Sequence, residues 1–192
     1  MITALIKFSE KGLLPDFLIR IGIQSLLKKR LKSLLNNEDL INLSNKKKFI
    51  QNMNSSPIAL VPDLANAQHY EIPSEFYNLC LGSHKKYSSC FWDKTTKTLQ
   101  DAESLSLEIT CRHAKLKDGQ KILELGCGWG SLSLWMASHY PKSKITSVSN
   151  SSSQKEYILK EAKKRNIKNL EIITCDMNDF SIKEKFDRVV SV

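Results

Sequence analysis

The feature that most constrains the fold is a glycine-rich turn placed directly after a short apolar run. The run covers residues 122–125, and three glycines follow it at alternate positions, 126, 128 and 130. Apolar residues then recur at helical spacing from Leu132 to Ala137. An apolar run bounded by a turn is typical of a buried parallel strand, and glycine permits positive φ and a close ligand. The stretch therefore predicts a strand, a glycine turn and a helix whose amino terminus faces a ligand crevice.

The residues on either side of this turn alternate between strand-like and helix-like patterns. The helix after the turn extends to about Tyr140, and Pro141 ends it. Such alternation is typical of an α/β fold with a parallel, doubly wound sheet and right-handed crossovers. Ligands bind these sheets at the carboxyl ends of the strands. The predicted strands are 122–125, 144–149, 170–175 and 186–192, and the other predicted helices are 99–115, capped by Thr95 or Thr96, and 154–166.

The first third of the chain predicts helices of a different kind. In residues 1–35, Leu14, Leu18 and Ile21 share one face, and basic residues cluster at 28–32. Such a basic amphipathic helix either packs its apolar stripe on its own domain or lies on a membrane surface. Residues 36–68 are polar and weakly periodic, which predicts short helices separated by loops, one of them at the lysine triplet 46–48.

Charge and cysteine content limit the partners and the compartment. The formal net charge is +9, but the lysines are scattered, so we expect no nucleic-acid interface. The five cysteines are odd in number and form no C-x-x-C pair, which argues against disulfides and a metal site. We therefore expect a reducing compartment and cytoplasmic localisation. No apolar stretch approaches the length of a transmembrane helix, and the first residues lack the unbroken apolar core of a signal peptide.

The spacing of the glycines distinguishes two kinds of cofactor turn. In a dinucleotide fingerprint, G-x-G-x-x-G, the third glycine would stand at Ser131. Here Glu124 stands two residues before the first glycine, so the run reads E-x-G-x-G-x-G. This run resembles the first motif of class I S-adenosylmethionine (SAM)-dependent methyltransferases. The cofactor-binding residues that this resemblance implies are Glu124, Gly126, Gly128 and Gly130.

Three further motifs narrow the resemblance. They are His69-Tyr-Glu-Ile-Pro, Tyr87-Ser-Ser-Cys-Phe-Trp and Ser149-Asn-Ser-Ser-Ser-Gln. With the glycine motif, they resemble the superfamily of cyclopropane-fatty-acyl-phospholipid synthases and coclaurine N-methyltransferase-like enzymes. The resemblance implies an enzyme with a Rossmann-like class I methyltransferase sheet, here its first four parallel strands, preceded by a helical N-terminal region. It divides the chain into a helical region (1–68), a segment covering substrate and cofactor (69–115) and the first half of the SAM-binding domain (116–192).

The resemblance also assigns residues to the cofactor SAM and to the methyl acceptor. Glu71 matches an acid that binds or deprotonates an amine substrate, and Tyr70 presents an aromatic face to a nearby cation. A surface or helix-cap role for Glu71 remains an alternative. The residues that match contacts to SAM are Tyr87 and Ser88 for the methionine part, Ser149, Asn150 and Gln154 for the ribose and adenine side, and Asp176 and Met177 for the adenine amino group.

Departures from the superfamily pattern separate its branches. Cyclopropane synthases carry a cysteine two residues after the tyrosine of the second motif, where this chain has Ser89. This difference favours N-methylation of a small amine over methylene transfer to a lipid acyl chain, which remains the alternative. The family's E-x-F-E-H type motif, expected after Val192, is absent, so we expect a truncated chain that retains the donor half. A third possibility is an inactive SAM-binding fragment or isoform that self-associates through an open strand edge.

Overall fold

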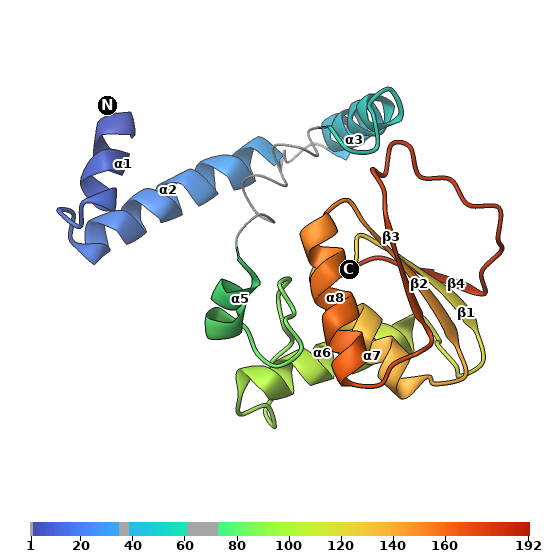
Figure 1. Cartoon of the computed structure of the whole chain (residues 1–192). Coiled ribbons are helices and arrows are strands. Elements are labelled where there is room, and N and C mark those ends of the chain that lie inside the picture. The colour runs from blue at the N-terminus through green and yellow to red at the C-terminus, as the bar shows by residue number, and fades with distance from the viewer. Residues whose placement is uncertain (1, 35–38, 61–72) are drawn as a thin grey trace. The chain divides into compact units, whose positions relative to one another are not determined.

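The structure is a computed structural model that describes residues 2–34, 39–60 and 73–192 of the 192-residue chain (Figure 1). The chain divides into two compact units, Met1–Pro57 and Ile58–Val192.

The described part of the first unit contains three helices. They are α1 (Ile2–Glu10), α2 (Asp16–Leu34) and α3 (Asp39–Asn54), and Pro15 directly precedes α2, as is common at the start of a helix. The prediction that residues 46–48 mark a loop is wrong, because these lysines lie inside α3, and lysine is a good helix former. None of the residues of α2, all of which are described, is buried, so Leu18 and Ile21 do not form a buried stripe.

In the described part of the second unit, the first two helices are α5 (Ser74–Cys80) and α6 (Leu99–His113). Thr98 caps α6: its hydroxyl accepts from the Asp101 N–H at 3.1 Å, and the Asp101 carboxylate accepts from the Thr98 N–H at 3.0 Å. The predicted caps, Thr95 and Thr96, are wrong, since both donate instead to the carboxylate of Asp93 in the preceding turn. The reciprocal pair of Thr98 and Asp101 is a capping box, in which a hydroxyl residue is followed by an acid three positions later.

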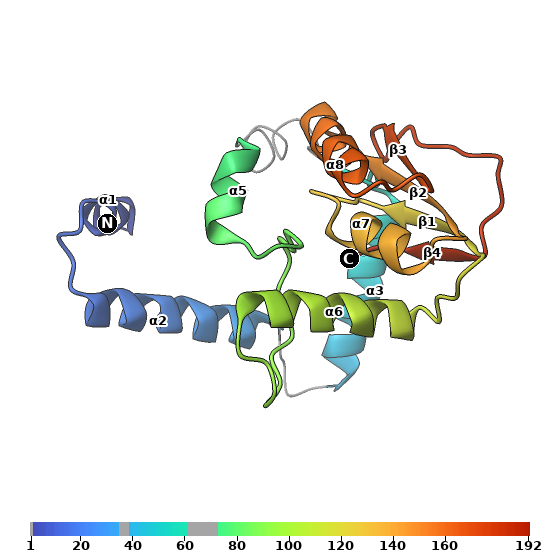
Figure 2. The same cartoon turned by 60° about the horizontal axis from the view of Figure 1, so that its bottom comes forward.

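A four-stranded parallel sheet forms the centre of this unit (Figures 1 and 2). The strand order is β3-β2-β1-β4, which places β1 and the glycine turn in the interior of the sheet. The parallel strands and their positions are confirmed, although the last strand is shorter than predicted. The strands are β1 (Lys121–Leu125), β2 (Lys144–Ser149), β3 (Leu170–Thr174) and β4 (Arg188–Val190), and the crossover helices are α7 (Ser131–His139) and α8 (Ser152–Lys164).

The core lies between one face of this sheet and the helices α6, α7 and α8. Ile122 and Ile145 pack with residues of α6 and α7, and Ile172 packs with residues of α7 and α8. Side chains alternate across a strand, and the strand register places these three isoleucines on the same face. The helices described around the sheet in residues 73–192 therefore cover one face, whereas a doubly wound sheet carries helices on both.

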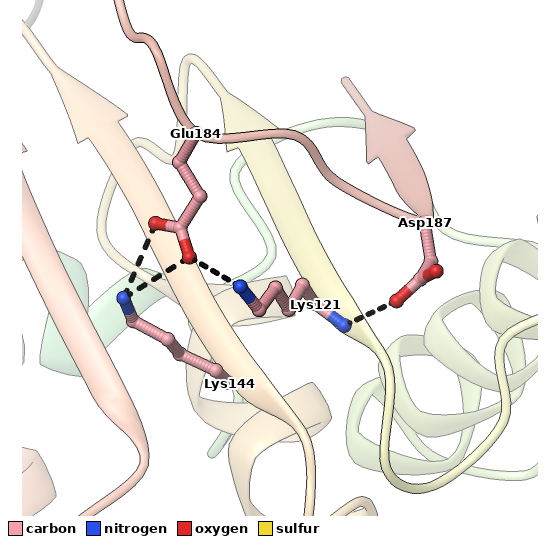
Figure 3. Close-up of polar contacts among 4 residues, drawn as sticks. All are labelled: Lys121, Lys144, Glu184 and Asp187. Carbon is pink, nitrogen blue, oxygen red and sulfur yellow. Dashed lines mark hydrogen bonds and ion pairs between the residues drawn. The ribbon is translucent and has the colours of Figure 1, made fainter.

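Charged side chains join the last connection to the amino ends of β1 and β2 (Figure 3). The Glu184 carboxylate pairs with the ammonium groups of Lys121 at 2.9 Å and Lys144 at 3.2 Å, and these hydrogen bonds lower its pKa. The Asp187 carboxylate accepts from the backbone N–H of Lys121 at 2.8 Å. Exposed ion pairs add little stability individually. Together, however, these contacts hold β4 beside β1 from the edge opposite the glycine turn.

Candidate functional site

The glycine turn adopts a backbone conformation that other residues rarely take. Gly126, Gly128 and Gly130 have φ values of 77°, 52° and 78°. A Cβ added at Gly126 or Gly128 would meet open space, whereas one at Gly130 would lie 2.5 Å from Cγ1 of Ile158. The first two glycines therefore leave their backbone open to a ligand, and the third allows α8 to pack closely.

Two hollows flank the turn and share Gly126 and Gly128 in their walls, so that together they form one crevice along the carboxyl edge of β1 and β2. We call them the larger lobe, of about 340 Å³, and the smaller lobe, of about 170 Å³. The larger lobe is also lined by Tyr87, Ser88, Glu124, Trp129 and Ser131, and the smaller one by Ser149, Asn150, Gln154, Asp176 and Met177.

In the smaller lobe, Gln154 offers a buried hydrogen-bond donor. Its carbonyl oxygen accepts from the Ser149 hydroxyl at 2.6 Å, and this contact fixes the orientation of the amide. Its Nε2 is buried and has no hydrogen-bond partner within the described part of the chain. Since an unpaired buried amide is costly, this side chain suits a ligand that carries an acceptor, such as a ribose hydroxyl.

The larger lobe also presents donors that lack partners among the described residues. These are the indole Nε1 of Trp129 and the hydroxyl of Ser131, both buried. The ring of Tyr87 meets the ring of Tyr77 edge-on at 5.5 Å and remains half exposed at the lobe. Aromatic faces of this kind attract cations, and the free donors suit an anionic or carbonyl group.

Among the described residues, Glu124 is the buried carboxylate that lines the larger lobe. Its side chain accepts hydrogen bonds from the hydroxyls of Ser133, on α7, and Ser147, on β2. Burial raises its pKa to about 7, and the two serine hydrogen bonds oppose this increase. At neutral pH, a cation in the crevice would therefore favour its ionised form.

The structure brings together most of the residues predicted for cofactor binding. All of them line the two lobes except Gly130, which does not line either and instead packs against α8. Tyr70 and Glu71, which were predicted as catalytic residues, lie outside the described residues.

A larger hollow, of about 840 Å³, lies between α5 and α8. Its walls carry both acids and bases, among them Glu75, Glu161, Lys160 and Arg165. It meets the crevice at Trp129 and Asn150 but contains none of the three glycines. Because the glycine turn and the strand ends define a ligand site in this fold, the two lobes, and not this hollow, are the candidate ligand site.

Sequence reasoning missed the polar residues that support the crevice from behind. Glu103 and Ser106 are buried on α6, and Lys86 is nine-tenths buried beside Tyr87. The buried face of α6 is therefore not purely apolar, since Glu103 and Ser106 lie on it with Ala102, Leu107 and Cys111. Apolar periodicity does not detect buried polar residues. The signal in the sequence that could have indicated this support is Glu103, a charged residue directly after the apolar Ala102 of the predicted helix.

Comparison with known proteins identifies the family. The model of the mycolic acid cyclopropane synthetase family matches residues 62–192, and the chain belongs to this family. The chain is 36% identical over 198 residues to (S)-coclaurine N-methyltransferase from Thalictrum flavum subsp. glaucum, covering 100% of this chain and 53% of that protein. The chain therefore spans about half the length of the curated relatives it matches.

Two solved structures are similar to the chain. One is coclaurine N-methyltransferase bound to N-methylheliamine and SAH, with a TM-score of 0.94 and 34% identity over 99% of this chain and 55% of that one. The other is the mycolic acid cyclopropane synthase CmaA1 complexed with SAH and CTAB, with a TM-score of 0.59 and 25% identity over 68% and 46%. The fold is that of these methyltransferase-related enzymes.

Other features of the described residues are consistent with this family but do not define it. The five cysteines, all within the described part, carry free thiols. No group of three metal-ligating side chains is found among the described residues. None of the described helices is long and apolar enough to cross a membrane.

Proposed function

We propose that this protein is a SAM-dependent methyltransferase that methylates the nitrogen of a small amine. The observation that carries the proposal is the crevice over Gly126 and Gly128, which is also lined by Gln154, whose buried Nε2 has no hydrogen-bond partner among the described residues. The similarity to coclaurine and pavine N-methyltransferases, each at 36% identity, supports an amine as acceptor. The chain spans about half the length of these relatives, and we propose that it is active by itself.

The residues present fit SAM. We assign its methionine part to the larger lobe, where Tyr87, Ser88 and the glycine turn lie, and its ribose and adenine to the smaller lobe. In that lobe the Gln154 amide would donate to the ribose side, and Asp176 and Met177 would adjoin the adenine. Bound SAM supplies a methyl group that its sulfonium already activates.

The protein's own task is to hold the amine nitrogen in line with the methyl group and to receive a proton. A secondary or primary amine that gains a methyl group must lose the proton on its nitrogen, so a base increases the rate. We propose Glu71 as this base and Tyr70 as the aromatic residue that orients the charged nitrogen. Both residues are assigned from the family resemblance.

The test is a methyl-transfer assay with the full 192-residue chain. The chain is incubated with methyl-labelled SAM and either a panel of secondary amines or vesicles of unsaturated phospholipid. We expect label on the amine nitrogen, and a loss of about 10²–10⁴-fold in rate for Glu71→Gln, in the range of a general base. Label in neither product, with SAM nevertheless bound, would identify an inactive cofactor-binding form.

A lipid acyl chain is the second candidate for the acceptor. The family model and the complex of CmaA1 with the detergent CTAB favour this possibility. The apolar residues exposed along α2, next to the basic residues 28–32, would then provide a contact with anionic membranes. Flotation with anionic vesicles at low and high salt tests this contact. A chain that does not float with the vesicles even at low salt argues against it.

Self-association through β4 is a further proposal about partners. This strand lies at the edge of the described sheet, and its Val189 is 59% exposed. Unpaired strand edges can pair with another chain. Light scattering over a range of protein concentrations should show a mass that rises above that of a monomer, and a constant monomer mass would exclude this contact.

A further inference from the structure

The segment that carries Tyr87 and Ser88 is fastened to α6 by one buried carboxylate. Glu103 is fully buried, and its two oxygens accept hydrogen bonds from three backbone N–H groups of this segment. The donors are Gly82 at 3.0 Å, His84 at 2.8 Å and Lys86 at 3.1 Å. A carboxylate that receives three N–H groups holds its partners in a fixed geometry, because each bond constrains a different residue.

Gly82 makes this approach possible. A Cβ at this position would lie 2.5 Å from Oε2 of Glu103, so any larger residue would displace the carboxylate. Two further contacts fasten the same segment to the same helix. The Ser106 hydroxyl accepts from the Phe91 N–H, and the His84 ring lies 3.1 Å from the Ser104 hydroxyl. One face of α6 therefore anchors the segment at both ends.

Lys86 transmits this anchoring to Ser88. Its ammonium donates to the Ser88 hydroxyl oxygen at 2.7 Å and to the Ser89 carbonyl at 3.1 Å. Because an ammonium can only donate, the Ser88 oxygen must accept, and its own proton remains free to donate. Ser88 and Lys86 both line the larger lobe. The hydroxyl is therefore oriented as a donor at the end of the crevice.

We propose that Glu103 is a positioning residue for cofactor binding, acting through the backbone of residues 82–86 and through Lys86 on the Ser88 hydroxyl. The proposal rests on the proposed function, since it concerns the affinity of the larger lobe for the methionine part of the cofactor. A purely structural role predicts lower stability alone. A positioning role predicts a loss of affinity beyond that caused by an equal loss of stability.

The test is calorimetric titration of the full chain with S-adenosylhomocysteine, together with thermal unfolding. Glu103→Ala should weaken binding roughly 10- to 100-fold, since small displacements of binding groups have effects of that size. Glu103→Gln should recover part of the affinity, because one oxygen already accepts from both Gly82 and Lys86. Gly82→Ala and Lys86→Met should weaken binding in the same direction.

The matched control is Asp101→Ala on the same helix. This substitution removes the capping box and lowers the melting temperature, but among the described residues the Asp101 carboxylate accepts hydrogen bonds only from the N–H groups of Lys97 and Thr98. It should leave the affinity within twofold of the wild-type chain. Amide hydrogen exchange should show faster exchange at Gly82, His84 and Lys86 in Glu103→Ala and unchanged exchange there in Asp101→Ala.

The outcomes separate the two proposals. A wild-type chain that binds, with Glu103→Ala no weaker than Asp101→Ala, contradicts the positioning role and leaves the proposed function intact. A wild-type chain that does not bind contradicts both. If Glu103→Ala fails to fold, Glu103→Gln and Lys86→Met decide the matter, and affinities within twofold of wild type for both overturn the inference.

Discussion

Glu124 carries a carboxyl group that folding removes from water. Burial raises its pKa from the ordinary value of 4.5 to about 7, so the folded chain binds a proton there that the unfolded chain releases. Between pH 4.5 and about pH 7, the free energy of unfolding must therefore decrease as the pH rises. A pKa difference of this size corresponds to about 3 kcal/mol.

We predict that Glu124→Gln removes this dependence. A glutamine can still accept from Ser133 and Ser147 through its carbonyl oxygen, but it carries no charge to bury. The free energy of unfolding of Glu124→Gln minus that of the wild-type chain should therefore increase by up to about 3 kcal/mol from pH 4.5 to pH 7.5. Urea unfolding at several pH values measures this difference, and a difference that stays constant over the range contradicts the burial argument.

Gln154 supports a second prediction at this scale. Gln154→Leu removes the free amide donor without adding a polar group, so an acceptor of the ligand in the smaller lobe, such as a ribose hydroxyl oxygen, would lose its partner. We expect the affinity for SAM to decrease at least about tenfold, as for loss of a buried hydrogen bond with a partner left unpaired. Equilibrium dialysis with labelled SAM measures it.

Lys163→Gln, an exposed change on the same helix, is the control for Gln154→Leu and should bind SAM as the wild-type chain does. Equal affinity of Gln154→Leu and Lys163→Gln would remove Gln154 from the site.

At the scale of elements, the contact between the glycine turn and α8 can be tested by comparing two glycines. Gly130→Ala incurs both a positive φ and a Cβ that meets Ile158, whereas Gly119→Ala incurs a positive φ of 87° in open space. We expect a loss of about 1–2 kcal/mol for the conformation at both positions and a further ~1–3 kcal/mol at Gly130. Equal losses, measured by thermal unfolding, would mean that Ile158 moves aside without cost.

The elements that the sequence predicted well are those with strong local signals. The strand β1 follows from a short apolar run next to a turn, and the glycines have the positive φ values that their spacing indicated. The helix at 39–54 was predicted as short helices separated by loops, because its polar residues show little apolar periodicity. The anchoring by Glu103 was missed, because it depends on three N–H groups about 20 residues away in the chain, which no local pattern encodes.

The residues of the crevice could be predicted for a reason that applies to the whole sheet. Parallel strands bring their carboxyl ends to one edge, so Gly126, Ser149 and Asp176 had to lie near one another once the strand order was fixed. The polar support on α6 and the orientation of the Gln154 amide could not be predicted, since both depend on side-chain packing. The acceptor side depends on Tyr70 and Glu71, which remain predictions.

The second unit contains the whole proposed cofactor crevice, although the chain spans about half the length of its relatives. The donor site should therefore function in this chain independently of what the acceptor side requires. The most direct test of this claim is a calorimetric titration of the 192-residue chain with SAM. We predict saturable binding of one SAM per chain, weakened in Gly128→Ala because a Cβ would project into the open crevice. An absence of binding heat and of any rise in melting temperature at millimolar SAM would contradict the assignment of this crevice to the cofactor.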